Sequence, residues 1–179
     1  MKTKDLSSIL LSILFVTSLM VPLLMSLSLS SQTACANPDP YVNIEWIRQF
    51  GTSDADRAYG MAVNGSDTIY VAGITGSTLP GQTSSGGNDA FVRKYDGTGN
   101  EIWTRQFGSS TDDYAMGVAV DGSDNVYITG ITWGALPEQE NLGGTDAFVR
   151  KYDGAGNEVW TKQFGTSAND RASGVVVDG

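Results

Sequence analysis

The sequence repeats itself with a period of 57 residues, and this period constrains the fold more than any other feature. Tryptophan, phenylalanine and valine recur at that spacing, as Trp46 and Trp103 illustrate. A unit of this size seldom buries its own apolar face, so we expect neighbouring units to cover one another. The copies span 46–102, 103–159 and, in part, 160–179.

Each copy alternates short β-rich runs with turn signals, and no segment has a helical period. Four strands per unit is the number found in one blade of a β-propeller. We therefore predict an all-β fold built from blades of four antiparallel strands. Two blades and the first strand of a third are expected, which makes an incomplete propeller. The predicted strands are 58–63, 69–75, 90–96, 102–107, 115–120, 126–132, 147–153 and 159–164.

The segments between these strands are rich in glycine, asparagine and aspartate. "NGSDT" at 64–68 and "DGSDN" at 121–125 join the first and second strands, and "DGTGN" at 96–100 and "DGAGN" at 153–157 join the third and fourth. These residues accept the positive φ values that tight hairpins require. Their spacing differs from that of an EF-hand calcium loop, so we interpret them as hairpin turns.

Residues 1–36 have the pattern of a secretory signal peptide. Lys2 and Lys4 precede a long apolar run, and Ala34-Cys35-Ala36 supplies a cleavage pattern. Two alternatives remain open, an uncleaved membrane anchor and a lipoprotein acylated at Cys35. With residues 37–44 as a short linker, the sequence predicts a secreted or cell-surface protein that contacts a membrane only if this segment is retained.

Composition excludes several classes of function. The chain contains no histidine, and its single cysteine lies in the predicted signal. Histidine-based triads and histidine metal sites are therefore impossible. A formal net charge of −9 also makes nucleic acid a poor partner. We predict no catalytic constellation, no metal site and no cofactor.

Four strings of the second copy together resemble a known repeat: "WTRQFGSS" at 103–110, "GVAVD" at 117–121, "NVYITGIT" at 125–132 and "DAFVRKYD" at 146–153. This combination is similar to the SBBP β-propeller repeat of bacterial and archaeal exported proteins, and the resemblance covers 45–179. It implies a propeller with a role in surface display, adhesion or carbohydrate contact. The family is tied to no single activity, so no active-site residue carries over.

A second string, "YDGAGNEVW" at 152–160, resembles the hairpin of quinoprotein-type propellers, in which a tryptophan packs adjacent blades together. A tryptophan that packs between blades is expected in any propeller, with or without a cofactor. The string therefore does not by itself imply a quinone. We keep as an alternative a glycan-active or quinone-dependent propeller enzyme whose catalytic residues lie outside this segment.

Candidate binding residues lie in the loops, where a rigid scaffold presents variable side chains. The loop after the second strand changes most between copies, and Trp133 is its aromatic outlier. It is expected either to stack on a ligand or to pack on the scaffold. Asp56, Asp113 and Asp170 recur in the loops before the first strands. They are expected either to bind a cation or basic groups as a ring, or to close their own loops.

The sequence thus predicts a non-catalytic binding or display module at the cell surface, engaged in adhesion and in glycan or protein contact. Its expected partners are a glycan or a surface protein, together with further blades of the same chain or other copies of it that close the ring. A purely structural stalk is a third interpretation.

Overall fold

The computed structural model describes residues 44–178, which form two separate β-sheets and no helix. None of these residues therefore belongs to a helix long and apolar enough to cross a membrane. The signal peptide predicted for 1–36 lies outside the described residues. The strands are β1 (Asp56–Val63), β2 (Ile69–Thr75), β3 (Asp89–Tyr95), β4 (Glu101–Phe107), β5 (Asp113–Val120), β6 (Val126–Thr132), β7 (Asp146–Tyr152) and β8 (Glu158–Phe164).

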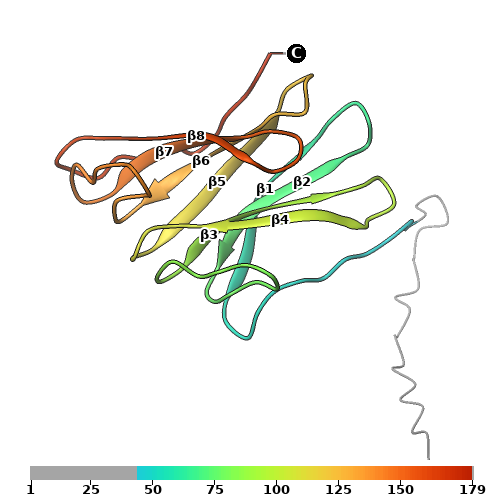
Figure 1. Cartoon of the computed structure of the whole chain (residues 1–179), viewed down its shortest axis with the longest axis horizontal. Coiled ribbons are helices and arrows are strands. Elements are labelled where there is room, and N and C mark those ends of the chain that lie inside the picture. The colour runs from blue at the N-terminus through green and yellow to red at the C-terminus, as the bar shows by residue number, and fades with distance from the viewer. Residues whose placement is uncertain (1–43, 179) are drawn as a thin grey trace, which may run out of the picture. The chain divides into compact units, whose positions relative to one another are not determined.

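Each sheet is an antiparallel meander in which consecutive strands are neighbours. The strand orders are β1-β2-β3-β4 and β5-β6-β7-β8. Figure 1 shows the two sheets side by side, with β5 of the second next to the first. The register is the same in both, since Ile69 pairs with Tyr95 and Val126 pairs with Tyr152. The prediction of four-stranded antiparallel blades is confirmed.

The strand bounds differ slightly from those predicted, for a local reason at each end. β1 and β5 begin two residues earlier, because Asp56 and Asp113 pair with the last threonine of the next strand. β3 ends at Tyr95, because the N–H of Asp96 donates to the carbonyl of Asn100 across the turn. That hydrogen bond belongs to the hairpin connection, so Asp96 closes the turn and does not extend the strand.

The hairpin turns have the backbone conformation that their residues predict. Asp67 and Asp124 have φ values of 57° and 67°, and Gly99 and Gly156 have values of 79° and 80°. Aspartate and glycine are among the residues that tolerate this left-handed region. The interpretation of the four Gly/Asn/Asp segments as hairpin turns is therefore confirmed.

The core lies between the two sheets. Trp103 and Phe107 on β4 are 8% and 6% exposed because they pack on the second blade. Phe107 meets Phe148 edge to face, with ring centroids 5.8 Å apart, and Trp103 lies 6.3 Å from Tyr152. Aromatic pairs of this kind add to the stabilisation from burial alone. Each blade therefore depends on its neighbour to cover an apolar face.

The third copy differs from the prediction of a first strand. Among residues 165–178 the structure has only one isolated bridge, between Thr145 and Asn169. The segment still lies where an inner strand belongs, because Gly174 packs against Gly117 as Gly117 packs against Gly60. An inner strand pairs only with the second strand of its own blade, and no such partner lies beside this segment in the described residues. It is therefore positioned without forming a ladder.

Gly130 in β6 is required because the backbone of β5 approaches it closely. A Cβ at this position would overlap the carbonyl oxygen of Tyr114. In the first blade, a Cβ at Gly73 would likewise overlap the carbonyl oxygen of Arg57. We predict that Gly130→Ala lowers the free energy of unfolding by about 3 kcal/mol or more, because the clash is with backbone that cannot turn aside.

Gly122 provides the matched control, since a Cβ there would meet nothing within 4 Å. Urea unfolding of both variants measures the difference. A Gly130→Ala variant as stable as Gly122→Ala would contradict the close packing of β5 on β6.

Candidate functional site

The blades have two distinct ends. The hairpin turns gather at one end, as the contact of Gly97 with Asp67 illustrates. The longer connections after β2 and β6, and those that lead into β1 and β5, lie at the other end, which we call the loop face (Figure 1). Each end holds a group of polar side chains that is a candidate for function.

The three recurrent aspartates close their own loops. Each accepts a hydrogen bond at 2.6 Å from the backbone N–H of the residue four positions earlier. The described residues hold no group of three or more His, Cys, Asp or Glu side chains placed to bind a metal. Of the two interpretations of these residues, the geometry supports loop closure. The pairs are Asp56 with Thr52, Asp113 with Ser109 and Asp170 with Thr166.

Two further aspartates, missed from the sequence, lie beside these loop-closing residues. A side chain at Gly108 would place its Cβ 2.5 Å from Oδ1 of Asp89 and 2.6 Å from Oδ2 of Asp113. Asp146 adjoins Asp170 in the same way. The repeated string "DAF" that opens β3 and β7 was the available signal. Asp89 and Asp113 are both 0% exposed, so this pair has no access to a substrate.

Burial raises the pKa of Asp113, and the charge of nearby Asp89 raises it further. Hydrogen bonds from Thr132 and Ser109 act in the opposite direction. A carboxyl group kept from water favours its neutral form, especially beside a second carboxyl group. The pair therefore belongs to the scaffold at the junction between blades.

The loop face has a concave pocket of about 360 Å³ at Trp133. The indole is 39% exposed and lies against Tyr114, with ring centroids 5.0 Å apart and planes inclined by 59°. Trp133 therefore both packs on the scaffold and remains accessible. These two rings form an apolar wall. The other lining residues are Ile131, Thr145, Asn169, Asp170 and Arg171.

Most of the other lining residues of this pocket are polar. Asn169 uses its amide oxygen to accept from the N–H of Thr145, which leaves its amide N–H₂ group to donate. Asp170 uses Oδ2 to close its loop. Within residues 44–178, the guanidinium of Arg171 has no hydrogen-bond or ion-pair partner. The pocket thus combines donors and acceptors with one carboxylate and one guanidinium, and its charges balance.

The repeat does not require this pocket. The residue equivalent to Trp133 in the first copy is Gly76, and the residue equivalent to Arg171 in the second is Tyr114. The first junction consequently lacks the indole, and Tyr114 lies against Tyr59 there, with centroids 6.4 Å apart. Sequence reasoning found Trp133 and Asp170 but missed Tyr114 and Arg171. Tyr114 lies on β5 of the same blade and Arg171 in the third copy, so only the fold brings them to Trp133.

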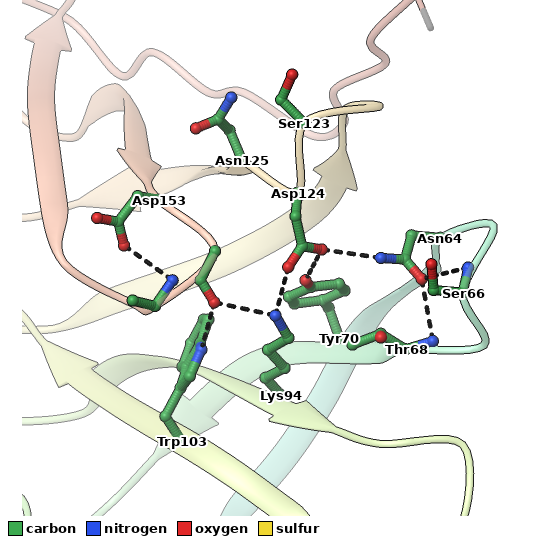
Figure 2. Close-up of polar contacts among 12 residues, drawn as sticks. Asn64, Ser66, Thr68, Tyr70, Lys94, Trp103, Ser123, Asp124, Asn125 and Asp153 are labelled. Carbon is green, nitrogen blue, oxygen red and sulfur yellow. Dashed lines mark hydrogen bonds and ion pairs between the residues drawn. The ribbon is translucent and has the colours of Figure 1, made fainter.

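At the hairpin end, Asp124 joins the two blades (Figure 2). Its carboxylate accepts hydrogen bonds from Asn64 at 2.8 Å and from the hydroxyl of Tyr70, and it pairs with Lys94 at 2.5 Å. Lys94 also donates to the carbonyl of Gly154 at 2.9 Å. A cavity of about 640 Å³ opens beside these turns. Both oxygens of Asp124 are used, so this cluster fastens the blades together.

Outer strand β4 docks on the second blade through two further hydrogen bonds. Trp103 Nε1 donates to the carbonyl of Gly154 at 3.1 Å, and Arg105 Nε donates to that of Gly156 at 2.6 Å. The recurrent tryptophan therefore packs between blades, which is the structural role expected of it.

Comparison with known proteins agrees with this architecture. Residues 102–137 match the model of the SBBP family, a beta-propeller repeat. The chain is 29% identical to the regulatory protein FlaEY of Caulobacter vibrioides over 83% of its own length. It is 24% identical to an uncharacterized WD repeat-containing protein of Acanthamoeba polyphaga mimivirus over 75% of its length. It spans only 17% and 12% of those two proteins.

The Asp124 cluster leads to a prediction about acid stability. Burial acts to raise the pKa of Asp124, but hydrogen bonds from Lys94 and Tyr70 and the charge of Lys94 outweigh it and lower the pKa. A carboxylate with a lowered pKa stabilises the fold above its unfolded pKa of about 4, and this stabilisation is lost as pH falls through the folded value. We predict that Asp124→Asn costs about 1–2 kcal/mol at pH 7 and that this cost decreases as pH falls below about 4.

Asp67→Asn is the matched control, because Asp67 occupies the same position and backbone conformation in the first copy. Urea unfolding between pH 2 and 7 measures both variants. An Asp124→Asn effect that persists unchanged at pH 2 would show that the carboxylate charge does not hold the blades together.

Proposed function

We propose that this chain is part of a non-catalytic binding and display module, secreted or held at the cell surface, whose loop face binds a glycan at Trp133. The observation that carries the proposal is the pocket itself. It is lined by an exposed indole and a tyrosine ring together with an amide, a carboxylate and a guanidinium. Binding pockets typically combine an apolar wall with a few convergent polar groups.

The chemistry of this pocket suits a neutral sugar. A pyranose ring has an apolar face that stacks on an aromatic ring, and hydroxyl groups that both donate and accept hydrogen bonds. The amide of Asn169, the carboxylate of Asp170 and the guanidinium of Arg171 offer both kinds of partner. A volume of about 360 Å³ is near the lower end for ligand pockets, which suits one or two sugar units better than a folded partner.

The scaffold supports a binding role over a catalytic one. Within residues 44–178, the paired carboxylates Asp89 and Asp113 are buried, and Asp124 is fully engaged between the blades. General acid–base catalysis needs groups that reach a substrate. The alternative, a glycan-active or quinone-dependent enzyme, would draw its reacting groups from outside these residues.

Contact with another protein is the second candidate function. Both relatives carry names that suit a repeat or interaction role, one a regulatory protein and the other a WD repeat-containing protein. Propeller folds host many unrelated functions, so these names support an interaction module without specifying its ligand.

Titration calorimetry of the full chain with cellotetraose, chitotetraose and maltotetraose tests the proposal. We expect at least one of the three to bind, and Trp133→Ala to weaken that binding about tenfold or more, as truncating a central aromatic contact commonly does.

Trp160→Ala is the matched control, because Trp160 is 37% exposed but lies on β8, away from the pocket. It is expected to leave the affinity within about twofold. Binding that survives Trp133→Ala unchanged would contradict this site. Absence of binding to all three sugars would favour the protein-contact function.

A further inference from the structure

The open side of the second blade exposes aromatic side chains whose equivalents pack against a blade at two other places in the structure. At those places, β4 packs on the second blade and residues 46–50 pack on the first. Its outer strand β8 presents Trp160, Lys162 and Phe164. Trp160 is 37% exposed and Phe164 is 50% exposed, whereas the equivalent Trp103 and Phe107 are 8% and 6% exposed. The difference arises because β4 is covered by the second blade and no described residue covers β8 in the same way.

Residues 46–50 display the same contact on the first blade without belonging to a sheet. Trp46 Nε1 donates to the carbonyl of Gly97 at 3.1 Å, as Trp103 does to Gly154. Arg48 Nε donates to the carbonyl of Gly99 at 2.7 Å. This segment therefore occupies the site that an outer strand of a preceding blade would occupy.

Phe50 completes this contact. Its ring meets Phe91 edge to face at 5.4 Å, and the guanidinium of Arg93 lies 3.9 Å from its centroid. Phe107 makes the same pair of contacts with Phe148 and Arg150. Each blade thus offers the same binding site for a phenylalanine ring, made of one edge-to-face contact and one cation–π contact.

The segment that occupies this site on the first blade and the exposed strand β8 have nearly the same sequence. Residues 46–53 read "WIRQFGTS" and residues 160–167 read "WTKQFGTS". Lys162 replaces Arg48, which keeps a cationic donor for the turn carbonyl. The second sequence can therefore make the side-chain contacts of the first.

Residues 44–50, which an incoming strand would have to displace from the first blade, are weakly held. Residues 44–50 form no strand and no backbone ladder within the described structure, so side chains alone retain them. Residues 165–178 lie against the inner part of the same open side, and their backbone hydrogen bonds to the second blade are confined to Ala168 and Asp170, which meet Gly144 and Thr145. Neither segment has the continuous ladder of hydrogen bonds that holds every strand of the two blades.

We propose that the β8 face binds a second copy of this chain, head to tail, with residues 160–164 of one copy replacing residues 46–50 on the first blade of the next. The two surfaces differ, so the contact is heterologous and builds a closed ring or an open filament.

Charge at the hairpin end supports the second copy as the occupant, with one opposing group. Lys94 and Tyr70 bind Asp124 at the internal junction, and their equivalents in the second blade are Lys151 and Tyr127. Asp67 of the second copy, the equivalent of Asp124, would bind these two residues. Asp121 occupies the position equivalent to Asn64, which donates to Asp124, and its charge would repel the carboxylate of the incoming Asp67. Tyr127 meanwhile donates to Asp121 at 3.1 Å. Association should therefore be weaker than the internal junction.

Sedimentation velocity of the full chain over a range of concentrations tests the proposal through Phe50 and Phe164. Phe164→Ala removes the incoming ring and should weaken association about tenfold or more. Phe50→Ala loosens the segment to be displaced and should strengthen association by a similar factor. Asp121→Asn should also strengthen it, because it restores the arrangement seen at Asn64.

The opposite signs of the two phenylalanine variants separate this contact from general apolar clustering, which would weaken with either substitution. Urea unfolding confirms that each variant is folded. The proposal is overturned if the native chain and Phe50→Ala both remain monomeric at every concentration. It is equally overturned if the two phenylalanine variants shift association in the same direction.

Discussion

The structure depends on the docking of one blade's outer strand on the hairpin turn of the next. Trp103 and Arg105 reach across to the carbonyls of Gly154 and Gly156. These hydrogen bonds fix the junction, and the aromatic core forms beneath them. Because a four-stranded sheet with apolar residues on both faces cannot shield itself, this junction is the condition for folding. The hydrogen bonds add direction to an otherwise non-directional apolar contact.

The junction also determines where function can reside. Each blade must solve the same packing problem, so the recurrent tryptophans, loop-closing aspartates and buried carboxylates serve the scaffold. The proposed glycan site instead lies where one copy departs from the repeat. Trp133 replaces Gly76, and Arg171 takes the place that Tyr114 fills at the preceding junction. These two departures contribute to a pocket that is lined by both apolar and polar groups on an otherwise repeated frame.

The sequence predicted most of the fold, because the 57-residue period and the Gly/Asn/Asp turns act locally. It predicted less of the site, because contacts between copies are non-local. Trp133 was visible as a divergent loop residue. Its contact with Tyr114 required β5 to pair with β6, and its proximity to Arg171 required the third copy to lie against the second blade. Asp89 was overlooked for a related reason, since its burial against Asp113 follows from the stacking of blades. The first strand predicted in the third copy is not formed, because a ladder needs a partner strand.

Native-state hydrogen exchange most directly tests the claim that the blades are stable only as a pair. If the junction is the condition for folding, the amides of β2 and β3 should exchange with the same opening free energy as those of β6 and β7, since both sheets open together. Separate opening free energies, with one blade fully protected while the other exchanges, would contradict this account.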